Sequence, residues 1–260
     1  SNTTFTNKTF TEMMNMMLYP TLYPTLTNPS NGFNLSPSGY KEIGEVIGTI
    51  TLSSTFNRGS INPDYGTNGF RSGLPNTYIY TGTGVTNQSS TSTSNSTTST
   101  TYTVILGAQS WTSAVAYDAG EQPLDSIGGN YDSPLAAGTT SAITKTITGV
   151  YPVFATTSTI GTLTQQSLQS MSSLIQVSMV TEAGSTDKQT IEIPNVGTFW
   201  SNITGLQYLN PISSNWETVL LSTFTITTGI FRTIQGASVE YTRYTHNGAI
   251  IGARQLRFLV

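Results

Sequence analysis

Short runs in which apolar and polar residues alternate, separated by Gly, Pro, Asn and Asp, extend from about Thr25 to the end of the chain. A period of two is that of a half-buried β-strand, and the separating residues are those of turns. No helical run of normal length lies between them, so the pattern predicts antiparallel sheets and an all-β fold. The runs are 45–52, 77–81, 102–106, 109–117, 142–150, 174–180, 189–193, 206–209, 218–221, 238–246 and 255–260.

The side-chain composition favours the same fold class. Charged residues make up 9% of the chain, against roughly 25% in a typical soluble domain, and Ser, Thr, Asn and Gly take their place. Ser and Thr compete for backbone hydrogen bonds inside helices, whereas Thr, Tyr, Val and Ile favour pleated sheets. A length of 260 residues suits two domains that each bury a core. We therefore expect two tandem antiparallel β-sandwich domains of Ig-like architecture.

Three segments follow from the pattern of runs and breaks. Residues 1–26 are expected to hold a short helix and a Pro-rich connector. The first sandwich domain is expected over residues 27–155, and the second over residues 156–260.

The predicted helix lies near the start of the chain. Thr9 and Glu12 fit a capping box, a methionine-rich run continues to Leu18, and Tyr19-Pro20 ends it. So short a helix is marginal alone in water, so its methionines need a partner surface, either the next domain or copies of the chain around a symmetry axis. The residues assigned to assembly are Met13, Met14, Met16 and Met17.

Residues 86–101 form a tract of Ser, Thr, Asn and Gln with no apolar side chain to bury. We interpret the tract as an exposed loop that joins two strands. A recognition tip is the alternative, since loops on rigid scaffolds often carry binding.

Asn247-Gly248 lies between the run 238–246 and the final run, and it is a typical type I′ turn sequence. The chain is therefore expected to close with a hairpin. The polar and aromatic side chains on that hairpin are candidates to meet acidic glycans, or to form cross-strand pairs or subunit contacts. These residues are Arg243, Tyr244, His246, Arg254 and Arg257.

Catalytic and metal-binding patterns are missing from the sequence. His246 is the single histidine, cysteine is absent, and no Gly-x-Ser-x-Gly motif occurs, so neither a serine hydrolase nor a zinc centre is predicted. The acidic stretch 118–132 matches no calcium loop, and we interpret its Asp and Asn residues as turn formers. We expect no enzymatic activity and no cofactor.

The net charge of -3 and the scattered basic residues argue against a nucleic-acid partner, since duplex binding requires clustered Lys and Arg. No apolar run reaches the roughly 18–20 residues that cross a bilayer as a helix. We therefore expect neither nucleic-acid binding nor membrane insertion.

Several motifs resemble a known family. They are Tyr40–Leu52 (YKEIGEVIGTITL), Gly149–Phe154 (GVYPVF), Val239–Gly248 (VEYTRYTHNG) and Gly252–Phe258 (GARQLRF). With these motifs the chain resembles fibre and appendage proteins of tailed bacteriophages, particularly crAss-like and other phages of Bacteroidetes hosts. The resemblance implies a homotrimeric fibre on the head or tail of a virion, in contact with other virion proteins. It also implies an outer domain that meets a host-surface glycan or protein, and it carries over no catalytic residue.

Two other functions stay open. One is a bacterial cell-surface adhesin or carbohydrate-binding module carried by a larger chain. The other, ranked last, is a depolymerase of surface polysaccharide, because the long β-helix repeats that commonly support such enzymes are absent from the sequence.

Overall fold

The computed structural model describes residues 8–156, 163–165, 168, 174–181, 189–195, 205–210, 212–248 and 252–259. Contacts within the chain group its residues into two compact units. Unit 1 comprises Ser1–Ser36, Thr49–Thr100 and Ser110–Lys145, and unit 2 comprises Pro37–Gly48, Thr101–Gln109 and Thr146–Val260. Both units use segments from the first half of the chain, so they do not coincide with domains at 27–155 and 156–260. The predicted domain limits stay a prediction.

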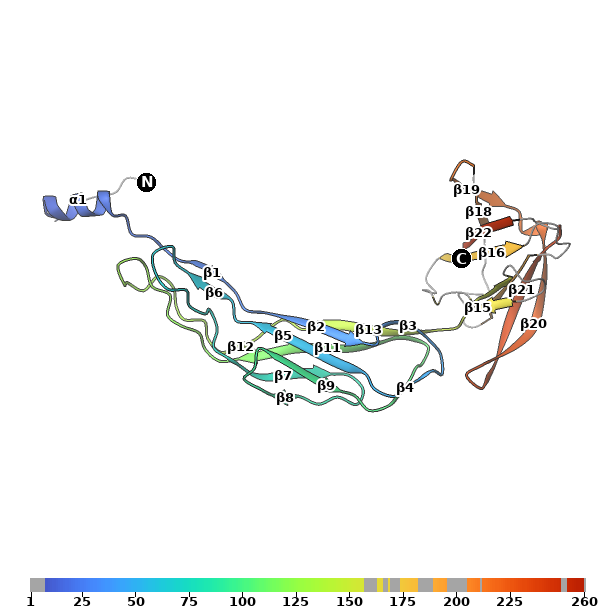
Figure 1. Ribbon diagram of the computed structural model, residues 1–260, viewed down its shortest axis with the longest axis horizontal. Coiled ribbons are helices and arrows are strands. Elements are labelled where there is room, and N and C mark those ends of the chain that lie inside the picture. The colour runs from blue at the N-terminus through green and yellow to red at the C-terminus, as the bar shows by residue number, and fades with distance from the viewer. Residues whose placement is uncertain are drawn as a thin grey trace. The chain divides into compact units, whose positions relative to one another are not determined.

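The fold is all-β with one short N-terminal helix, as the sequence predicts (Figure 1). Most strand pairings of the described residues are antiparallel, whereas β3 (Gly39–Glu42) pairs in parallel with β13 (Ile143–Val150), and Leu106 and Gly149 form a parallel bridge. No helix in the described part of the chain has the length and apolar character needed to cross a membrane.

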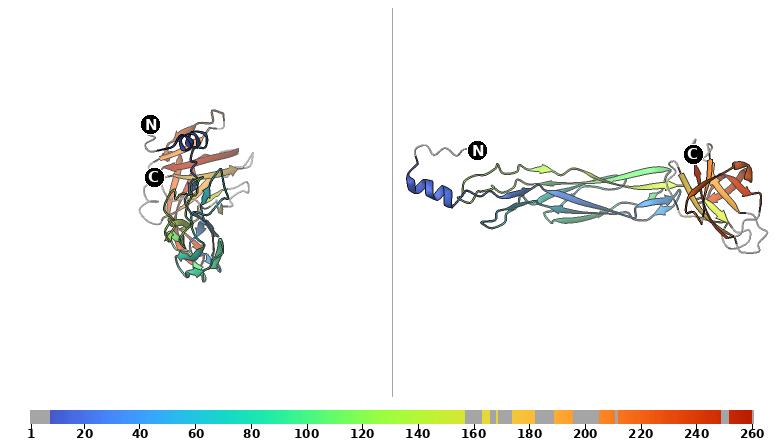
Figure 2. Two further views of the ribbon diagram at one scale, coloured as in Figure 1. Left: turned by 90° about the vertical axis from the view of Figure 1, so that its left-hand side faces the viewer. Right: turned by 90° about the horizontal axis from the view of Figure 1, so that it is seen from above.

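Unit 1 is built on two sheets whose strands lie side by side (Figures 1 and 2). One sheet has the order β2-β5-β9. The other has the order β3-β13-β11-β7-β8, with β12 paired to β11. Of this second sheet, β7, β8, β12 and most of β11 belong to unit 1, whereas β3 and residues 146–150 of β13 belong to unit 2. Strands β1 and β6 form a separate two-stranded sheet. The strands are β1 (Thr25–Thr27), β2 (Ser30–Ser36), β5 (Thr51–Asn57), β6 (Ser60–Asn62), β7 (Pro75–Thr81), β8 (Gln88–Ser89), β9 (Ser94–Thr98), β11 (Gly107–Tyr117) and β12 (Gly138–Thr139).

The interior between these sheets combines aromatic rings with hydroxyl hydrogen bonds. Tyr78 and Tyr80 are 0% and 3% exposed, and Trp111 is 1% exposed. The Tyr78 hydroxyl donates to the Ser92 carbonyl at 2.7 Å, and the Tyr80 hydroxyl donates to the Asn95 carbonyl at 3.1 Å. The first bond links β7 to the turn before β9 and the second links β7 to β9 itself, so the tyrosines supply apolar packing and also satisfy backbone groups of the tract 86–101.

Most residues of the tract 86–101 are exposed, as predicted, but the tract is not a single loop. It contains β8 and β9, and β9 pairs antiparallel with β5 from Thr51↔Thr98 to Thr55↔Ser94. The tract has no apolar side chain, but its backbone pairs with β5 and accepts the tyrosine hydrogen bonds of β7. A strand therefore forms here because its neighbours supply the partners, which the local sequence does not reveal.

Unit 2 contains two larger sheets, with the orders β15-β14-β17-β21-β20 and β16-β22-β18-β19. The small pair β4-β10 also belongs to it. The remaining elements are β4 (Val46–Ile47), β10 (Tyr102–Thr103), β14 (Phe154–Thr156), β15 (Leu163–Gln165), β16 (Leu174–Thr181), β17 (Thr190–Pro194), β18 (Gly205–Leu209), β19 (Trp216–Val219), η1 (Leu221–Thr223), β20 (Phe224–Ile234), β21 (Ala237–His246) and β22 (Gly252–Leu259).

The core of unit 2 lies between these two sheets. Alternate residues of β17, such as Ile191 and Ile193, meet Leu256 and Phe258 of β22. This is the two-layer packing that period-two alternation predicts. The buried members are Val153, Ala155, Ile191, Ile193, Leu206, Phe224, Tyr244, Leu256 and Phe258.

The predicted closing hairpin at Asn247-Gly248 is wrong. β21 pairs with β17 and β20, whereas β22 pairs with β16 and β18, so the chain passes from one sheet to the other after β21. The hairpin turn lies instead at Gln235-Gly236, between β20 and β21, where both residues have the positive φ (46° and 85°) that such turns require. Asn247 anchors the crossing, since its side-chain amide donates to the Ser222 carbonyl at 3.0 Å.

Candidate interaction sites

The N-terminal helix α1 (Phe10–Leu18) has the predicted capping box. The Glu12 backbone N–H donates to Thr9 Oγ1 at 3.2 Å, and the Thr9 backbone N–H donates to Glu12 Oε2 at 2.7 Å. The backbone and hydroxyl hydrogen bonds from Thr9 lower the pKa of Glu12. The helix therefore has a well-defined start, and it ends where the Tyr19 N–H donates to the Asn15 carbonyl ahead of Pro20.

Five apolar residues of α1 recur at the spacing i, i+3, i+4, i+7 and i+8, which places them on one face of the helix. We call this face the α1 stripe, and it consists of Phe10, Met13, Met14, Met17 and Leu18. Phe10, Met17 and Leu18 are 73%, 69% and 62% exposed, and Met14 is also exposed. Met13 is half-buried, and the side chain of Met16 lies outside the described residues. The spacing is that of a core-facing helix, yet the face is open.

The connector after α1 is fixed to a loop of unit 1. The Leu22 N–H donates to Ser126 Oγ at 2.8 Å, and the Ser126 N–H donates to the Leu22 carbonyl at 3.0 Å. Tyr23 stacks on Tyr131 with ring centroids 4.9 Å apart. The expected stiff connector therefore has defined contacts beyond its two prolines.

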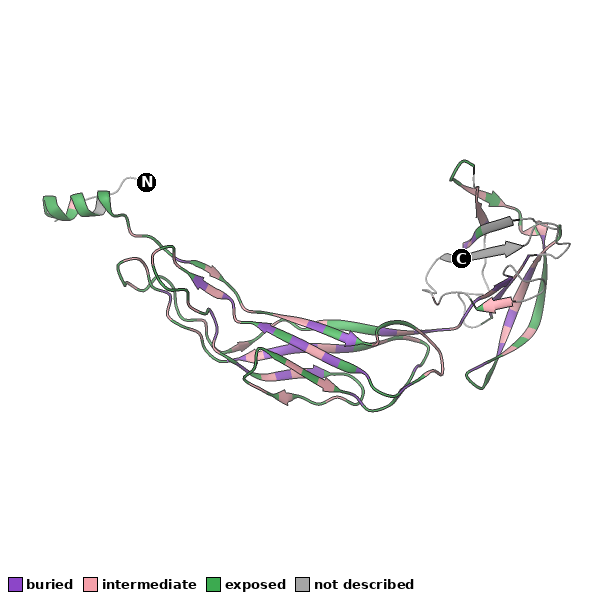
Figure 3. Cartoon of the chain, in the orientation of Figure 1, coloured by how far each residue is buried: buried purple, intermediate pink, exposed green. Residues whose placement is uncertain are grey.

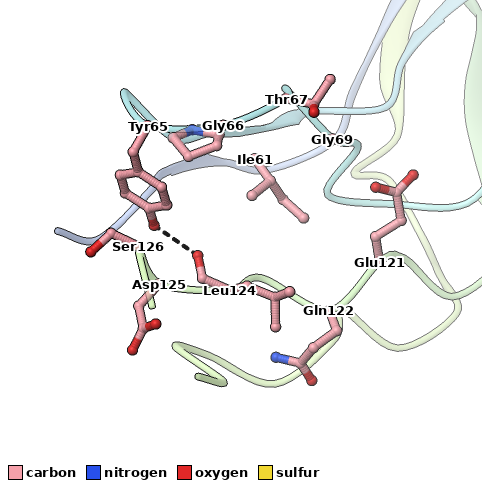
Figure 4. Close-up of a pocket in the computed structure, with 11 residues that line it drawn as sticks. Ile61, Tyr65, Gly66, Thr67, Gly69, Glu121, Gln122, Leu124, Asp125 and Ser126 are labelled. Atoms are coloured by element: carbon pink, nitrogen blue, oxygen red, sulfur yellow. Dashed lines mark hydrogen bonds between the residues drawn. The ribbon is translucent and has the colours of Figure 1, made fainter. Parts of the chain in front are cut away.

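A pocket of about 340 Å³ lies in the same loop region of unit 1 (Figure 4). Tyr65 borders it and donates its hydroxyl to the Leu124 carbonyl at 2.8 Å. Its two carboxylates, Glu121 and Asp125, lie at opposite ends of the pocket in Figure 4. Asp125 accepts the backbone N–H groups of Ile127 and Gly129, as a turn former does. Within the described ranges, no three His, Cys, Asp or Glu residues lie close enough to hold a metal ion.

The five candidate ligand residues divide over both sheets of unit 2. Tyr244 of β21 is 6% exposed and packs on Phe258, and burial raises the pKa of its hydroxyl. His246 packs edge-on against Phe224 at 5.1 Å, and its Nδ1 lies 3.1 Å from the Gly248 backbone nitrogen. Both side chains are therefore engaged with their own chain.

The other two candidates, Arg254 and Arg257, lie in β22, which belongs to the second large sheet of unit 2. Arg257 donates from Nε to Gln207 Oε1 at 2.7 Å, and its guanidinium lies 4.3 Å from the centre of the Trp216 ring. The side chain of Arg254 lies outside the described residues, and its backbone pairs with Met179 of β16.

Arg243 is the candidate that the structure joins to further charged residues. It lies directly opposite Glu192 of β17, whose side chain is 0% exposed. Arg243 donates to Glu192 Oε1 from Nε at 2.8 Å and from Nη2 at 2.5 Å. Arg232 of β20 donates from Nε to the other carboxylate oxygen and stacks over Phe154 at 4.3 Å. We call Arg232, Arg243 and Glu192 the arginine site.

Sequence reasoning missed Glu192 and Arg232. Glu192 lies within a predicted strand, but nothing local shows that it is buried opposite an arginine. Arg232 lies in β20, which the sequence runs do not include. The sequence offers one indication of this site: Glu192 is the single charged residue in the strand Thr190–Pro194 (TIEIP), where it lies between two isoleucines.

Comparison of this chain with protein-family models, with curated proteins and with solved structures finds no match. Its function is therefore inferred from its own residues and their geometry.

Proposed function

We propose that this chain is a non-catalytic structural subunit of a virion fibre or appendage, on head or tail, which assembles as a homotrimer and takes part in attachment to the host surface. The observation that carries the assembly role is the open α1 stripe. The motifs that resemble phage fibre proteins support the virion location.

The α1 stripe favours packing on copies of itself. Burying one large apolar side chain is worth about 1.5–3 kcal/mol, and an isolated helix shorter than about 12–15 residues is marginal in water. Phe10 and Met17 are one heptad apart, with Met13 and Met14 between them, which is the pattern of a seam between parallel helices. Identical stripes arranged around a rotation axis bury one another, and methionine adapts to the resulting gaps.

The sandwich suits a fibre for a related reason. Its strands carry hydroxyls and amides in place of ions, with charged residues at 9% of the chain. Surfaces of this kind pack side by side without burying unpaired charges, which are costly to desolvate. Neighbouring subunits can therefore contact one another along their strands.

The oligomeric state of purified protein at micromolar concentration tests the assembly role. We expect a trimer by sedimentation equilibrium for the unmodified chain, and dissociation for the stripe variant F10A/M17A. Alanine has the highest helix propensity, so this variant removes apolar area without weakening the helix itself. The matched control, T11A/N15A, changes the polar side of α1 and should stay trimeric. A monomeric unmodified chain would refute the proposal.

The location is tested separately. Antibody against the chain should label appendages of purified virus particles in electron micrographs. Labelling of bacterial cell surfaces, with none on particles, would favour the adhesin alternative.

A further inference from the structure

We propose that the arginine site binds the negatively charged group of an acidic sugar. The inference gives a ligand class to the attachment role proposed above and rests on it, but it does not depend on the assembly through α1.

The site lies on the face of its sheet that is turned away from the main core of unit 2. Ile191, Ile193 and Tyr244 point into that core, so the alternating residues Glu192 and Arg243 lie on the opposite face. β20, which carries Arg232, is exposed along most of its length, as Figure 3 shows. A ligand therefore reaches the site from solvent.

The charges in the site do not balance. One carboxylate meets two guanidinium groups, which leaves a net charge of about +1, since arginine stays protonated in proteins. Glu192 is the acid with which both arginines form ion pairs in the described part of the chain. Glu42 is another acid near this site, since its charge acts on Tyr241. Its carboxylate accepts a hydrogen bond from the Gln235 side chain, and the ion pairs of the two arginines are with Glu192. The surplus positive charge is therefore available to an anion.

The hydrogen-bond donors that remain are suitably placed for an oxyanion. Glu192 takes the Nε of both arginines and one Nη of Arg243, which leaves both Nη atoms of Arg232 and one of Arg243 without an acceptor among the described residues. The two side chains are 28% and 37% exposed, so these nitrogens are accessible. The Phe154 ring and Glu192 hold Arg232 in place. Fixed guanidinium groups of this kind bind carboxylates and sulfates with two hydrogen bonds.

A stabilising role alone does not explain the second arginine. A single arginine already neutralises Glu192, and a buried ion pair adds little net stability over apolar residues of the same size. The second guanidinium instead raises the positive charge next to solvent. A cation that is fixed, partly exposed and not neutralised is a feature of binding sites.

Hydroxyl groups surround the site on the same face. Thr227 of β20 lies opposite Arg243, and Thr245 follows Arg243 by two residues. Thr190 lies opposite Thr245, with their hydroxyl oxygens 3.4 Å apart. Toward the β20–β21 turn the face becomes apolar, with Val239 and Tyr241 buried. A charged centre beside neutral hydroxyls fits a sugar ring that carries one acidic group.

Binding to the unmodified 260-residue chain tests the proposal, with galacturonic acid as the probe and titration followed by NMR of the protein. The galacturonic acid methyl ester has the same ring without the charge and serves as the neutral control. We expect saturable binding of the acid and binding of the ester that is weaker by about tenfold or more. Galactose 6-sulfate is the third arm, and tighter binding of this sugar than of galacturonic acid identifies sulfated glycans as the source of the oxyanion.

The variant Arg232→Gln removes the surplus charge while Glu192 keeps its partner Arg243, so the sheet is expected to fold. It should weaken galacturonate binding about tenfold, and Arg232→Lys should bind with intermediate affinity because lysine keeps the charge but loses the planar fork. The matched control Arg257→Gln removes an arginine from the other sheet and should bind as the unmodified chain does.

Two results overturn the inference. One is equal binding of the acid and its methyl ester, or no binding of either acidic sugar. The other is an Arg232→Gln variant that binds as tightly as the unmodified chain. Sedimentation of the same samples separates the two proposals: a trimer that binds no acidic sugar refutes the site alone, and a monomer that binds it refutes the assembly alone.

Discussion

Replacing Ser54 with alanine tests whether hydrogen bonds, in addition to apolar packing, hold the two sheets of unit 1 together. Ser54 of β5 and Ser113 of β11 lie in opposite sheets, with their hydroxyl oxygens 2.7 Å apart. Their exposed fractions are 2% and 0%. Ser54 also interacts with Tyr80: burial raises the pKa of the Tyr80 hydroxyl, and a hydrogen bond with Ser54 opposes that rise. Ser54 therefore has a second partner, whereas the Ser113 hydroxyl has none besides Ser54 in the described structure.

This asymmetry sets the expected magnitudes. In Ser54→Ala the buried Ser113 hydroxyl loses its partner, which should reduce the free energy of unfolding of unit 1 by about 1–3 kcal/mol. In Ser113→Ala the Ser54 hydroxyl keeps Tyr80, so the loss should be about 0.5–1 kcal/mol. The double variant leaves no hydroxyl of the pair without a partner. Its loss should be no larger than that of Ser54→Ala alone, a coupling of about 1 kcal/mol.

Hydrogen exchange of the intact chain, measured by mass spectrometry, is the suitable assay. A chain with two units does not give a single free energy of unfolding from a melting curve, whereas exchange reports each segment separately. Peptides that cover β5 and β11 should exchange faster in the order predicted above. Peptides that cover β17 in unit 2 are the internal control. Equal effects of the two single substitutions, or effects that simply add in the double variant, would refute the reasoning.

Three further predictions concern other positions. In Gly82→Ala, the added Cβ would overlap Trp111 Cδ1, and the φ of +134° disfavours any side chain. Peptides that cover β7 and β11 should therefore exchange faster, with a loss of about 1–3 kcal/mol in the free energy of unfolding of unit 1. Hydrogen bonds, first that from Tyr208, lower the pKa of Glu217. The stability that they give is present above the ordinary value of 4.5 and is lost as pH falls below it. Unit 2 should therefore melt at a lower temperature at pH 3 than at pH 6, and this difference should be smaller in E217Q. Burial raises the pKa of Tyr241 above the ordinary 10.0, so its contribution is complete below pH 10 and is lost as pH rises further; absorbance titration should show a tyrosine that ionises only as the protein unfolds.

The sequence predicts strands well where one face is apolar. The run 109–117 lies within β11, and the run 238–246 lies within β21. It fails for β20, although this strand is as long as β11. The pairing of β20 with β21 shifts between Thr227 and Ile230, where Gly229 has a φ of +72°. Odd-numbered residues before this bulge and even-numbered residues after it therefore face the same side of the sheet. The alternation of apolar and polar residues is interrupted at this bulge, so the sequence pattern does not identify β20 as a strand.

The candidate site shows a similar division. The sequence identifies Arg243 as a polar residue of the predicted closing hairpin, and Arg243 lies in the arginine site. Its partners come from two other strands, and the register that sets Glu192 opposite Arg243 is a property of the sheet. The Asn247-Gly248 signal misled because a turn sequence fixes a local bend but does not determine which strand follows it in the sheet.

The α1 stripe and the arginine site are an exposed apolar face and a charged cluster in a chain whose polar groups are mostly uncharged. Elsewhere its polar groups are mostly hydroxyls and amides that satisfy one another, as Ser54 does with Ser113. An open apolar face and an unbalanced pair of arginines are both unfavourable in an isolated chain, and neither is needed to form a sheet. Each becomes favourable when a matching surface covers it, an identical helix in the first case and an oxyanion in the second. Because the two features depend on different forces, high salt should weaken sugar binding while leaving, or even strengthening, the association of α1.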